Sequence, residues 1–335
     1  MALRVAINGY GRIGRNVLRA WFEAGTPPGL EIVAINDLGK PEALAHLTRY
    51  DSSHGRFGEA VELRGHDLHI AGKRIRLSSE SRPEQLSWAA LDVDVVLECT
   101  GQFRARHDAA RHLAAGAKKV IIGAAPFDTV DATVVYGVNH QTLRDQHLII
   151  SSVSCTTHAL VPLVKILDEA FGIESGLMTE IHAVTSDQVV LDHTHRDLRR
   201  GRAAGQNIIP TTSSSIGALR RVLPDMADRI DGYSIRVPTL NVAAIDFSFV
   251  ATQPLTVQGI NELFQGKAAG EYREILDYCV EPLVSSDFNH SPYSLIFDAT
   301  QTCVVGQQAK VLVWYDNEWG YAHRLLDLCK YLSQR

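Results

Sequence analysis

Residues 3–14 read LRVAINGYGRIG, a short apolar run followed by glycines at positions 9, 11 and 14. The run LRVAI predicts a buried strand, and residues 12–24 have the apolar spacing of a helix. In such a strand–turn–helix unit, Gly9 permits a tight turn and Gly11 lets the backbone approach a pyrophosphate, while Gly14 lets helix and strand pack closely. The stretch therefore predicts a dinucleotide-binding fold.

The type of dinucleotide is indicated by the end of the second expected strand. Residues 31–35 form that strand, and Asp37 follows it, about 20 residues past Gly14. A carboxylate here accepts hydrogen bonds from the ribose hydroxyls of adenosine and repels a 2′-phosphate, so the sequence predicts NAD rather than NADP. The N–H groups at the helix start, around Arg12 and Ile13, are expected to face the cofactor phosphates.

The first part of the chain alternates apolar runs with helical segments, which is typical of a parallel, doubly wound α/β sheet with right-handed crossovers. Besides the elements named above, we expect a helix over residues 107–115 and strands over residues 93–97, 119–122, 133–136 and 147–153. This alternation predicts a Rossmann domain for NAD over residues 1–153.

The pattern changes after residue 155. A long helix to residue 171 precedes β-prone runs at residues 177–184, 232–237, 241–252 and 310–314. These broad runs indicate a mostly antiparallel sheet, and apolar residues at helical spacing over 320–333 predict a closing helix. We therefore expect an α+β catalytic domain over residues 154–316 and a C-terminal helix, residues 317–335, that returns to the NAD-binding domain.

Composition and charge exclude several classes of protein. The 335 residues are 45% hydrophobic and carry a net charge of −5, so we expect a folded protein that binds neither nucleic acid nor membrane. The basic run at residues 196–202 is interpreted as a solvated face or a subunit contact. No signal-like segment or apolar run of about 18 residues occurs, which predicts a cytoplasmic protein.

The spacing of the cysteines and histidines argues against disulfide bonds and metal sites. The five cysteines lack CxxC spacing, so neither a disulfide framework nor a zinc site is expected, and a reducing compartment fits. His193 and His195 form an H-x-H pair without a third residue at ligand spacing. We therefore expect no metal.

Cys155 is the candidate nucleophile. The expected strand at residues 147–153 runs into Ser154-Cys155-Thr156-Thr157-His158 and then into an apolar helix. Because a helix N-terminus favours negative charge, we expect the pKa of this thiol to be lowered. The thiolate needs a base, and the chain has 14 histidines. His182, in the β-like run LMTEIHAVT, is one candidate by its setting.

A resemblance decides among these histidines. The motifs NGYGRIGRNVLRA, ECTGQF, SCTTH, LRRGRAA, NIIPTT, RVPTLNV, DFNHS and WYDNEWGY occur in this order along the whole chain. They resemble the glyceraldehyde-3-phosphate dehydrogenase family. The resemblance implies glycolytic or gluconeogenic, NAD-dependent, phosphorylating oxidation of glyceraldehyde 3-phosphate to 1,3-bisphosphoglycerate. It implies a thiohemiacetal and a thioester on Cys155, with His182 as the general base.

The resemblance also implies binding residues and an assembly. The run RDLRRGRAA resembles a loop that packs against the cofactor of a neighbouring subunit in a homotetramer. Added cofactor contacts are expected at Thr100, Gly101, Asn317 (on the nicotinamide carboxamide) and Tyr321. Phosphate contacts are expected at Thr185 and Arg236 for the substrate, and at Ser154, Thr156, Ser213 and Ser214 for inorganic phosphate.

Three stretches depart from the family pattern. The family run S-N-A-S-C-T-T-N is here SSVSCTTH over residues 151–158, with Ser152, Val153 and His158 as the replacements. A Thr-Gly pair that contacts inorganic phosphate is replaced by the serines at 213 and 214, and IIGAAP lacks the usual serine of I-S-A-P.

These departures leave two alternatives open. One is an erythrose-4-phosphate dehydrogenase, which hydrolyses the acyl-enzyme with water and serves pyridoxal phosphate biosynthesis. The other is a catalytically weak paralogue with a binding role. Thr185 favours the phosphorylating enzyme, because the erythrose enzyme lacks threonine at that position.

Overall fold

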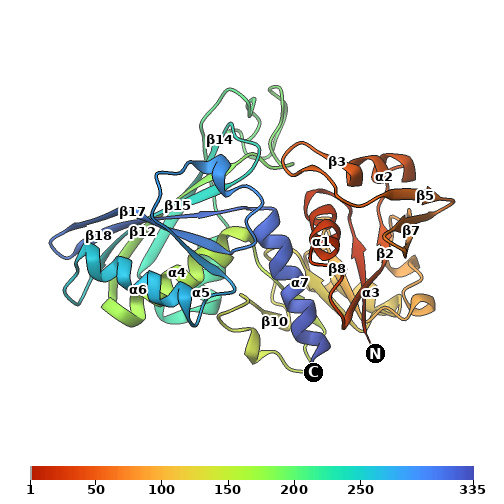
Figure 1. Cartoon of the computed structure of the whole chain (residues 1–335), viewed down its shortest axis with the longest axis horizontal. Helices are drawn as coiled ribbons and strands as arrows, with labels where there is room; N and C mark the ends of the chain where they lie inside the picture. Colours follow the sequence, from red (N-terminus) through yellow and green to blue (C-terminus); the bar gives the residue numbers. More distant parts are fainter. Residues whose placement is uncertain (1) are drawn as a thin grey trace. The chain divides into compact units, whose positions relative to one another are not determined.

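The computed structural model describes residues 2–335, which divide into two compact units (Figure 1). Unit 1 comprises the chain up to residue 153 together with residues 321–335, and unit 2 comprises residues 154–320. The return to unit 1, at residue 321, lies a few residues later than the expected position at 317, because helix α7 (Trp319–Ser333) begins in unit 2 and ends in unit 1. No helix among residues 2–335 is long and apolar enough to cross a membrane.

Unit 1 is built on a nine-stranded sheet in the order β10-β11-β9-β8-β1-β2-β7-β6-β5. From β10 to β7 the neighbouring strands run parallel, which confirms the doubly wound architecture, and β6 and β5 add an antiparallel edge. The strands are β1 (Leu3–Asn8), β2 (Leu30–Asn36), β5 (Val61–Arg64), β6 (Asp67–Ile70), β7 (Lys73–Ser78), β8 (Val95–Glu98), β9 (Lys119–Ile122), β10 (Ala132–Thr133) and β11 (Ile149–Ser151).

The expected strand over residues 133–136 is cut short in the structure. The Asn139 side chain accepts a hydrogen bond from the Val135 N–H and donates one to the Thr133 carbonyl, at 2.8 and 2.9 Å. Both backbone groups are thereby withdrawn from strand pairing, so β10 ends at Thr133.

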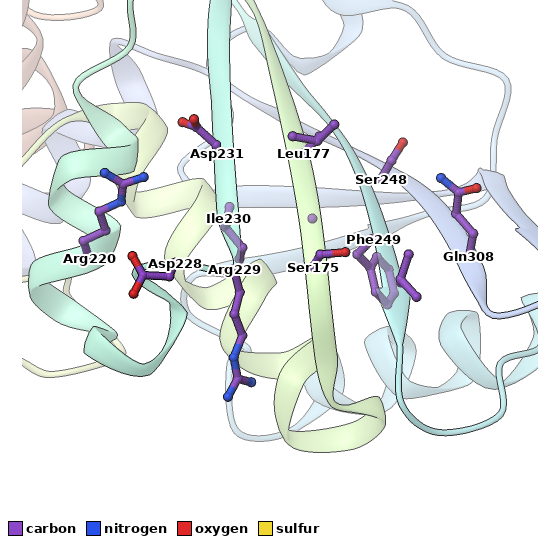
Figure 2. Close-up of a pocket in the computed structure, with 12 residues that line it drawn as sticks. Ser175, Leu177, Arg220, Asp228, Arg229, Ile230, Asp231, Ser248, Phe249 and Gln308 are labelled. Atoms are coloured by element: carbon purple, nitrogen blue, oxygen red, sulfur yellow. The ribbon is translucent and has the colours of Figure 1, made fainter.

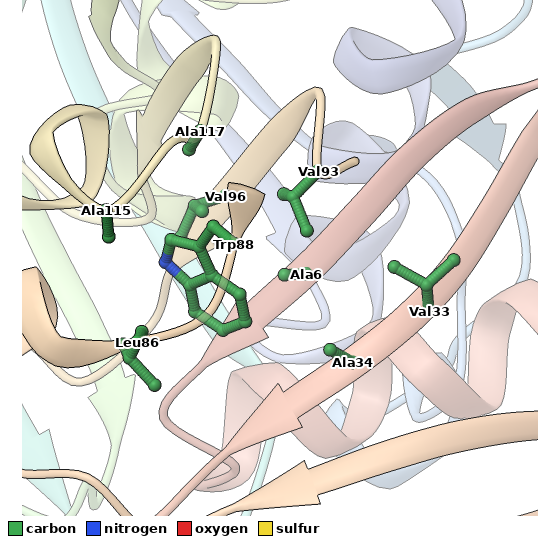
Figure 3. Close-up of a cluster of buried hydrophobic side chains, with 9 residues drawn as sticks. All are labelled: Ala6, Val33, Ala34, Leu86, Trp88, Val93, Val96, Ala115 and Ala117. Atoms are coloured by element: carbon green, nitrogen blue, oxygen red, sulfur yellow. The ribbon is translucent and has the colours of Figure 1, made fainter. Parts of the chain in front are cut away.

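Helices and a tryptophan-centred cluster complete the core of unit 1. Figure 3 shows Trp88 lying among the small side chains of Ala6, Ala34 and Val96. Its indole N–H donates to Nδ1 of the buried His112 at 3.0 Å. The helices are α1 (Arg12–Glu23), α2 (Pro41–Arg49), α3 (Arg106–Ala114) and most of α7, and a two-strand ribbon joins β3 (Tyr50–Asp51) to β4 (Gly55–Arg56).

Unit 2 contains a seven-stranded sheet in the order β13-β14-β12-β15-β18-β17-β16. The sheet is mostly antiparallel, as expected. Among the strand pairs of the described residues, only β12 with β14 and β16 with β17 run parallel. The strands are β12 (Ile173–Ala183), β13 (Ile209–Thr211), β14 (Ile230–Val237), β15 (Ala243–Ala251), β16 (Leu276–Cys279), β17 (Leu295–Val305) and β18 (Gln308–Tyr315).

Three helices cover one face of this sheet: α4 (Cys155–Phe171), α5 (Ser215–Val222) and α6 (Val257–Ala269) (Figure 1). The strand register places chemically active residues in one row. His182 on β12 is level with Arg236 on β14 and Ala243 on β15, and Ala243 is level with Tyr315 on β18. The row lies at the carboxyl end of β12, where α4 begins to pack.

Candidate active site

Cys155 is the first residue of α4, and its thiol faces a histidine. The Ser154 hydroxyl caps the helix by accepting a hydrogen bond from the Thr157 N–H at 3.2 Å. The Cys155 Sγ lies 3.6 Å from Nε2 of His182, within the loose hydrogen-bond reach of a thiol. The structure thus brings together the predicted nucleophile and the histidine favoured as its base.

The electrostatics of this pair differ from the sequence-based expectation. Burial raises the pKa of the Cys155 thiol to about 12, aided by the charge of Glu180 and opposed by Thr156 and Arg236. The expected lowering by the helix terminus was therefore wrong, because the cost of desolvating the thiolate is larger. Burial, and next the charge of Arg236, lowers the pKa of His182 to about 4, so its imidazole is neutral near pH 7 and has a lone pair for a proton.

A buried chain of hydroxyl groups lies beside the pair. The Thr156 hydroxyl donates to Oε1 of Glu180 at 2.7 Å and therefore accepts from the Tyr315 hydroxyl at 2.8 Å. The same Glu180 oxygen is 3.8 Å from Nε2 of His182. Thr156 is only 3% exposed, so its hydroxyl does not line an open phosphate position as we had expected.

Sequence reasoning missed Glu180 and Tyr315. Period-two alternation on a strand places Glu180 and His182 on the same face, and this signal could have linked the carboxylate to the histidine. Tyr315 joins them only through the pairing of β12, β15 and β18. No local pattern in the sequence indicates that contact.

Arg236 and Thr185 lie at the same edge of the unit 2 sheet. Nη1 of Arg236 is 2.6 Å from Nδ1 of His182 and 3.2 Å from the Ala183 carbonyl, while its Nε is buried without a partner. The Thr185 N–H and hydroxyl both donate to Oε1 of Gln188, at 2.7 and 3.0 Å. Of the two residues predicted to bind the substrate phosphate, Thr185 follows β12 and Arg236 is near the end of β14. Both therefore lie at the carboxyl ends of neighbouring parallel strands.

The predicted serines for inorganic phosphate lie on separate segments. Ser154 Oγ is 2.7 Å from the Thr157 hydroxyl at the start of α4. Ser213 and the exposed Ser214 precede α5, and Ser213 Oγ is 2.6 Å from the Ser215 hydroxyl. Among the described residues, no hydrogen bond joins Ser213 or Ser214 to Cys155 or His182. The structure therefore does not connect all the predicted phosphate residues to the catalytic pair by direct contact.

In unit 1, the glycine-rich turn follows β1 at the point where the strand order reverses. Gly9 has φ +90°, and a Cβ there would lie 2.6 Å from the Thr100 nitrogen. At Gly14 a Cβ would lie 2.2 Å from the Gly9 carbonyl, whereas a Cβ at Gly11 would meet nothing within 4 Å. The backbone is thus packed tightly behind the turn and open at Gly11, as the approach of a pyrophosphate requires.

The surroundings of this turn also suit a dinucleotide. Gly11 at the start of α1 makes no side-chain cap hydrogen bond, and the next residues, Arg12 and Ile13, are half-buried. The Asp37 carboxylate, after β2, accepts from the Tyr10 N–H at 2.7 Å and the Gly39 N–H at 2.8 Å. Its position is therefore fixed by the turn itself. The Arg12 guanidinium is paired with Asp51.

Three further predicted cofactor residues follow β8 or lie in the first turn of α7. The Thr100 N–H and hydroxyl donate to the Glu98 carboxylate, and Gly101 follows with φ +72°. The Tyr321 hydroxyl donates to the Val153 carbonyl at 3.0 Å. Val153 is fully buried and has φ +46°, in the left-handed region that β-branched residues rarely adopt.

Asn317 in unit 2 carries an unmet acceptor. The residue is 5% exposed, and its Oδ1 is buried without a hydrogen-bond partner. A carboxamide N–H₂ is a donor that would satisfy this oxygen. The orphaned oxygen therefore fits a carboxamide such as that of NAD.

A pocket in unit 2 lies apart from the Cys155–His182 pair. A pocket of about 520 Å³ lies across β14, β12 and β15 (Figure 2), where two arginines and two aspartates balance in charge. It is lined by Ser175, Gly176 and Leu177 of β12 rather than by His182. Among residues 2–335, no group of three or more His, Cys, Asp or Glu side chains could hold a metal ion.

Comparison with known proteins gives matches over both units. Residues 3–106 match the family described as glyceraldehyde 3-phosphate dehydrogenase, NAD binding domain, and residues 154–317 match the C-terminal domain of the same enzyme. Two proteins of Cupriavidus necator, named glyceraldehyde-3-phosphate dehydrogenase, plasmid and chromosomal, are each 52% identical to this chain over 327 residues. These alignments cover 98% of this chain and 97% of each relative.

Proposed function

Since the chain belongs to the glyceraldehyde-3-phosphate dehydrogenase family and is an NAD-dependent oxidoreductase, we propose that it oxidises glyceraldehyde 3-phosphate to 1,3-bisphosphoglycerate with inorganic phosphate. The observation that supports this most is the 3.6 Å approach of Cys155 Sγ to His182 Nε2 at the start of a capped helix. A thiol and a neutral imidazole in this arrangement are suited to covalent catalysis on an aldehyde.

In this proposal the thiol proton passes to Nε2 of His182 and the thiolate adds to the aldehyde carbon. The proton returns to the oxygen, which gives a thiohemiacetal. His182 then removes this hydroxyl proton as hydride leaves the carbon, and a thioester remains on Cys155. Bound NAD supplies the hydride acceptor. Attack of inorganic phosphate on the thioester carbon breaks the C–S bond and releases the acyl phosphate and the thiolate.

The anionic groups are assigned to separate side chains. We propose that Arg236 and Thr185 bind the phosphate of the substrate, because a guanidinium offers two parallel donors to a phosphate. Ser154, Ser213 and Ser214 are proposed for inorganic phosphate. Ser154 Oγ accepts the Thr157 N–H, and its own proton is available to a phosphate when the Thr157 hydroxyl donates in their 2.7 Å contact. The Thr156 hydroxyl, already engaged with Glu180, is proposed to support the nucleophile instead.

We propose that the cofactor lies along the glycine-rich turn. The turn and the α1 start supply N–H groups to the phosphates, Asp37 accepts from the ribose, and Tyr321 supports the chain before the nucleophile. The residues proposed for NAD are Gly9, Gly11, Arg12, Ile13, Gly14, Asp37, Thr100, Gly101, Asn317 and Tyr321. Three apolar side chains beside the basic run are exposed: Val190, Leu191 and Leu198. Burial of these side chains against another subunit supports the proposed homotetramer. Sedimentation equilibrium would measure the mass of the assembly.

Replacing Asp37 by Ala is expected to raise KM for NAD and to reduce the enzyme's preference for NAD over NADP. Hydrogen bonds to a charged group are worth about 1.5–3 kcal/mol, so KM for NAD should rise about 10- to 100-fold while KM for NADP rises less. Initial rates with each cofactor measure both values. Asp67→Ala, on strand β6 of the same unit, is the control. Equal use of NAD and NADP by the unaltered enzyme would contradict the ribose assignment.

The proposed reaction requires inorganic phosphate, and this requirement separates it from hydrolysis. Turnover with glyceraldehyde 3-phosphate is expected to rise with phosphate and to saturate, because a bound nucleophile attacks from a fixed position. Arsenate, a similar oxyanion, should replace it. NADH formation is followed at 340 nm with and without each anion. Phosphate-independent turnover that is fastest with erythrose 4-phosphate would overturn the proposal.

A further inference from the structure

Glu180 is a buried carboxylate beside Cys155 and His182. It is 2% exposed and lies two residues before His182 on strand β12. Its Oε1 accepts from the Thr156 hydroxyl at 2.7 Å and lies 3.8 Å from Nε2 of His182. Among residues 2–335, its Oε2 has no hydrogen-bond partner. A buried carboxylate oxygen without a donor is costly, which points to a role in the reaction rather than in folding.

The charge of Glu180 acts in opposite senses on the two members of the catalytic pair. Burial raises the pKa of the Cys155 thiol, and the charge of Glu180 raises it further, which disfavours the thiolate. Burial and Arg236 lower the pKa of His182, and the charge of Glu180 opposes them, which favours the imidazolium. When a proton passes from the thiol to Nε2, both charges form together, so the two effects of Glu180 oppose each other.

The balance changes once the sulfur is bonded to the substrate. In the proposed thiohemiacetal the sulfur carries no negative charge, so Glu180 has no thiolate to repel. Nε2 of His182 then takes the hydroxyl proton, and the C–H bond breaks with its electron pair leaving as hydride. Only the imidazolium forms beside Glu180, and an opposite charge within about 4–6 Å favours it.

We propose that Glu180 is a positioning residue for the oxidation step, in which it stabilises the protonated His182 ring without promoting formation of the Cys155 thiolate. This inference rests on the proposed function, in which His182 removes the hydroxyl proton. The Thr156 hydroxyl, itself bonded to Tyr315, holds the carboxylate in place. The unpartnered Oε2 supports the inference, because no hydrogen bond disperses the charge of that oxygen.

The other charged and titratable groups around the His182 ring do not supply this effect to the same extent. Arg236 on β14, with Nη1 2.6 Å from Nδ1, opposes protonation of the ring. Tyr315 on β18 lies 6.2 Å away between ring centroids, and burial raises its pKa well above its usual value, so it is neutral near pH 7. Glu318 favours the protonated ring less than Glu180 does.

The test compares two rates in Glu180→Gln, which keeps an oxygen for the Thr156 hydroxyl but removes the charge. The first is the NADH burst with glyceraldehyde 3-phosphate, which reports the oxidation step. The second is alkylation of Cys155 by iodoacetamide in enzyme without substrate, followed by mass spectrometry, which reports thiolate formation. The ratio of burst rate to alkylation rate is expected to fall about tenfold. Loss of an opposite charge at this distance weakens a base about 10- to 1,000-fold, and part of that loss appears in the rate.

Two variants and an isotope serve as controls. Glu174→Gln makes the same change at an exposed position of β12 and should leave the ratio unchanged. Glu180→Asp keeps the charge on a shorter side chain and should restore most of the ratio. In Glu180→Gln, deuterium at the aldehyde carbon should slow the burst, which places the loss at hydride removal.

An unchanged ratio in Glu180→Gln would overturn the inference, whether both rates fall together or neither falls. A ratio in Glu180→Asp as low as in Glu180→Gln would do the same, since the shape of the side chain rather than its charge would then matter. A burst in Glu180→Gln that deuterium does not slow would also contradict it. Phosphate-dependent turnover by the unaltered enzyme would still support the proposed function in each case, whereas its absence would contradict the proposed function itself.

Discussion

Cys155→Ser is expected to lower the rate of NADH formation about 10⁴-fold or more, because loss of a covalent nucleophile removes the whole addition pathway. A serine hydroxyl is a far weaker nucleophile than a thiolate and would place its oxygen next to His182 without forming a thioester. Stopped-flow measurement of the NADH burst gives the rate. The variant should keep its fold and its affinity for NAD, since the cofactor residues are untouched.

Cys303→Ser is the matched control for this prediction. Cys303 is exposed on β17, whereas Cys155 is half-buried, so accessibility alone would favour reaction at Cys303. With iodoacetamide, we expect loss of activity to follow labelling of Cys155. Loss of activity with label on another cysteine would refute the assignment.

His182→Asn is expected to slow the NADH burst about 10²–10⁴-fold, the usual contribution of a general base. In the unaltered enzyme the pKa of His182 is lowered to about 4, so protonation of the ring removes the base only as the pH falls towards that value. Without the imidazole, hydroxide must take the proton, and the residual rate should continue to rise with pH across the neutral range.

Burst rates over a pH series measure this difference. His69→Asn, which alters a histidine on strand β6 of unit 1, should leave the profile unchanged. A His182→Asn profile parallel to that of the unaltered enzyme would mean that another group is the base.

Much of the fold could be predicted because its signals are local. The apolar run before Gly9 predicts β1, and the helical spacing of apolar residues after Gly11 predicts α1. The polar residues that begin at Ser154, between an apolar strand and an apolar helix, predict the start of α4. Strands β5 to β7 were missed. They are short and alternate buried with more exposed residues, β5 and β6 pair antiparallel at the edge of the sheet, and β7 pairs with both β6 and β2. Their formation depends on pairing between segments, which no continuous apolar run indicates.

The candidate site was predictable only in part, because its geometry depends on strand pairing. Cys155 is indicated by its position at a helix start, but the link between Arg236 and His182 joins residues 54 positions apart. It exists because β12 and β14 are parallel neighbours in register. The thiol pKa depends on burial, which opposes the helix terminus and is not visible in the motif SCTT.

Val153 shows how selection acts on a single backbone angle. A β-branched residue at φ +46° costs about 1–3 kcal/mol of folding stability, which glycine would recover. Glycine would also free the rotation of the chain just before the residue that caps α4. The valine side chain is fully buried, however, and glycine would lose its packing at a cost of similar size. Screens for heat resistance and for turnover should therefore both keep valine at this strained angle.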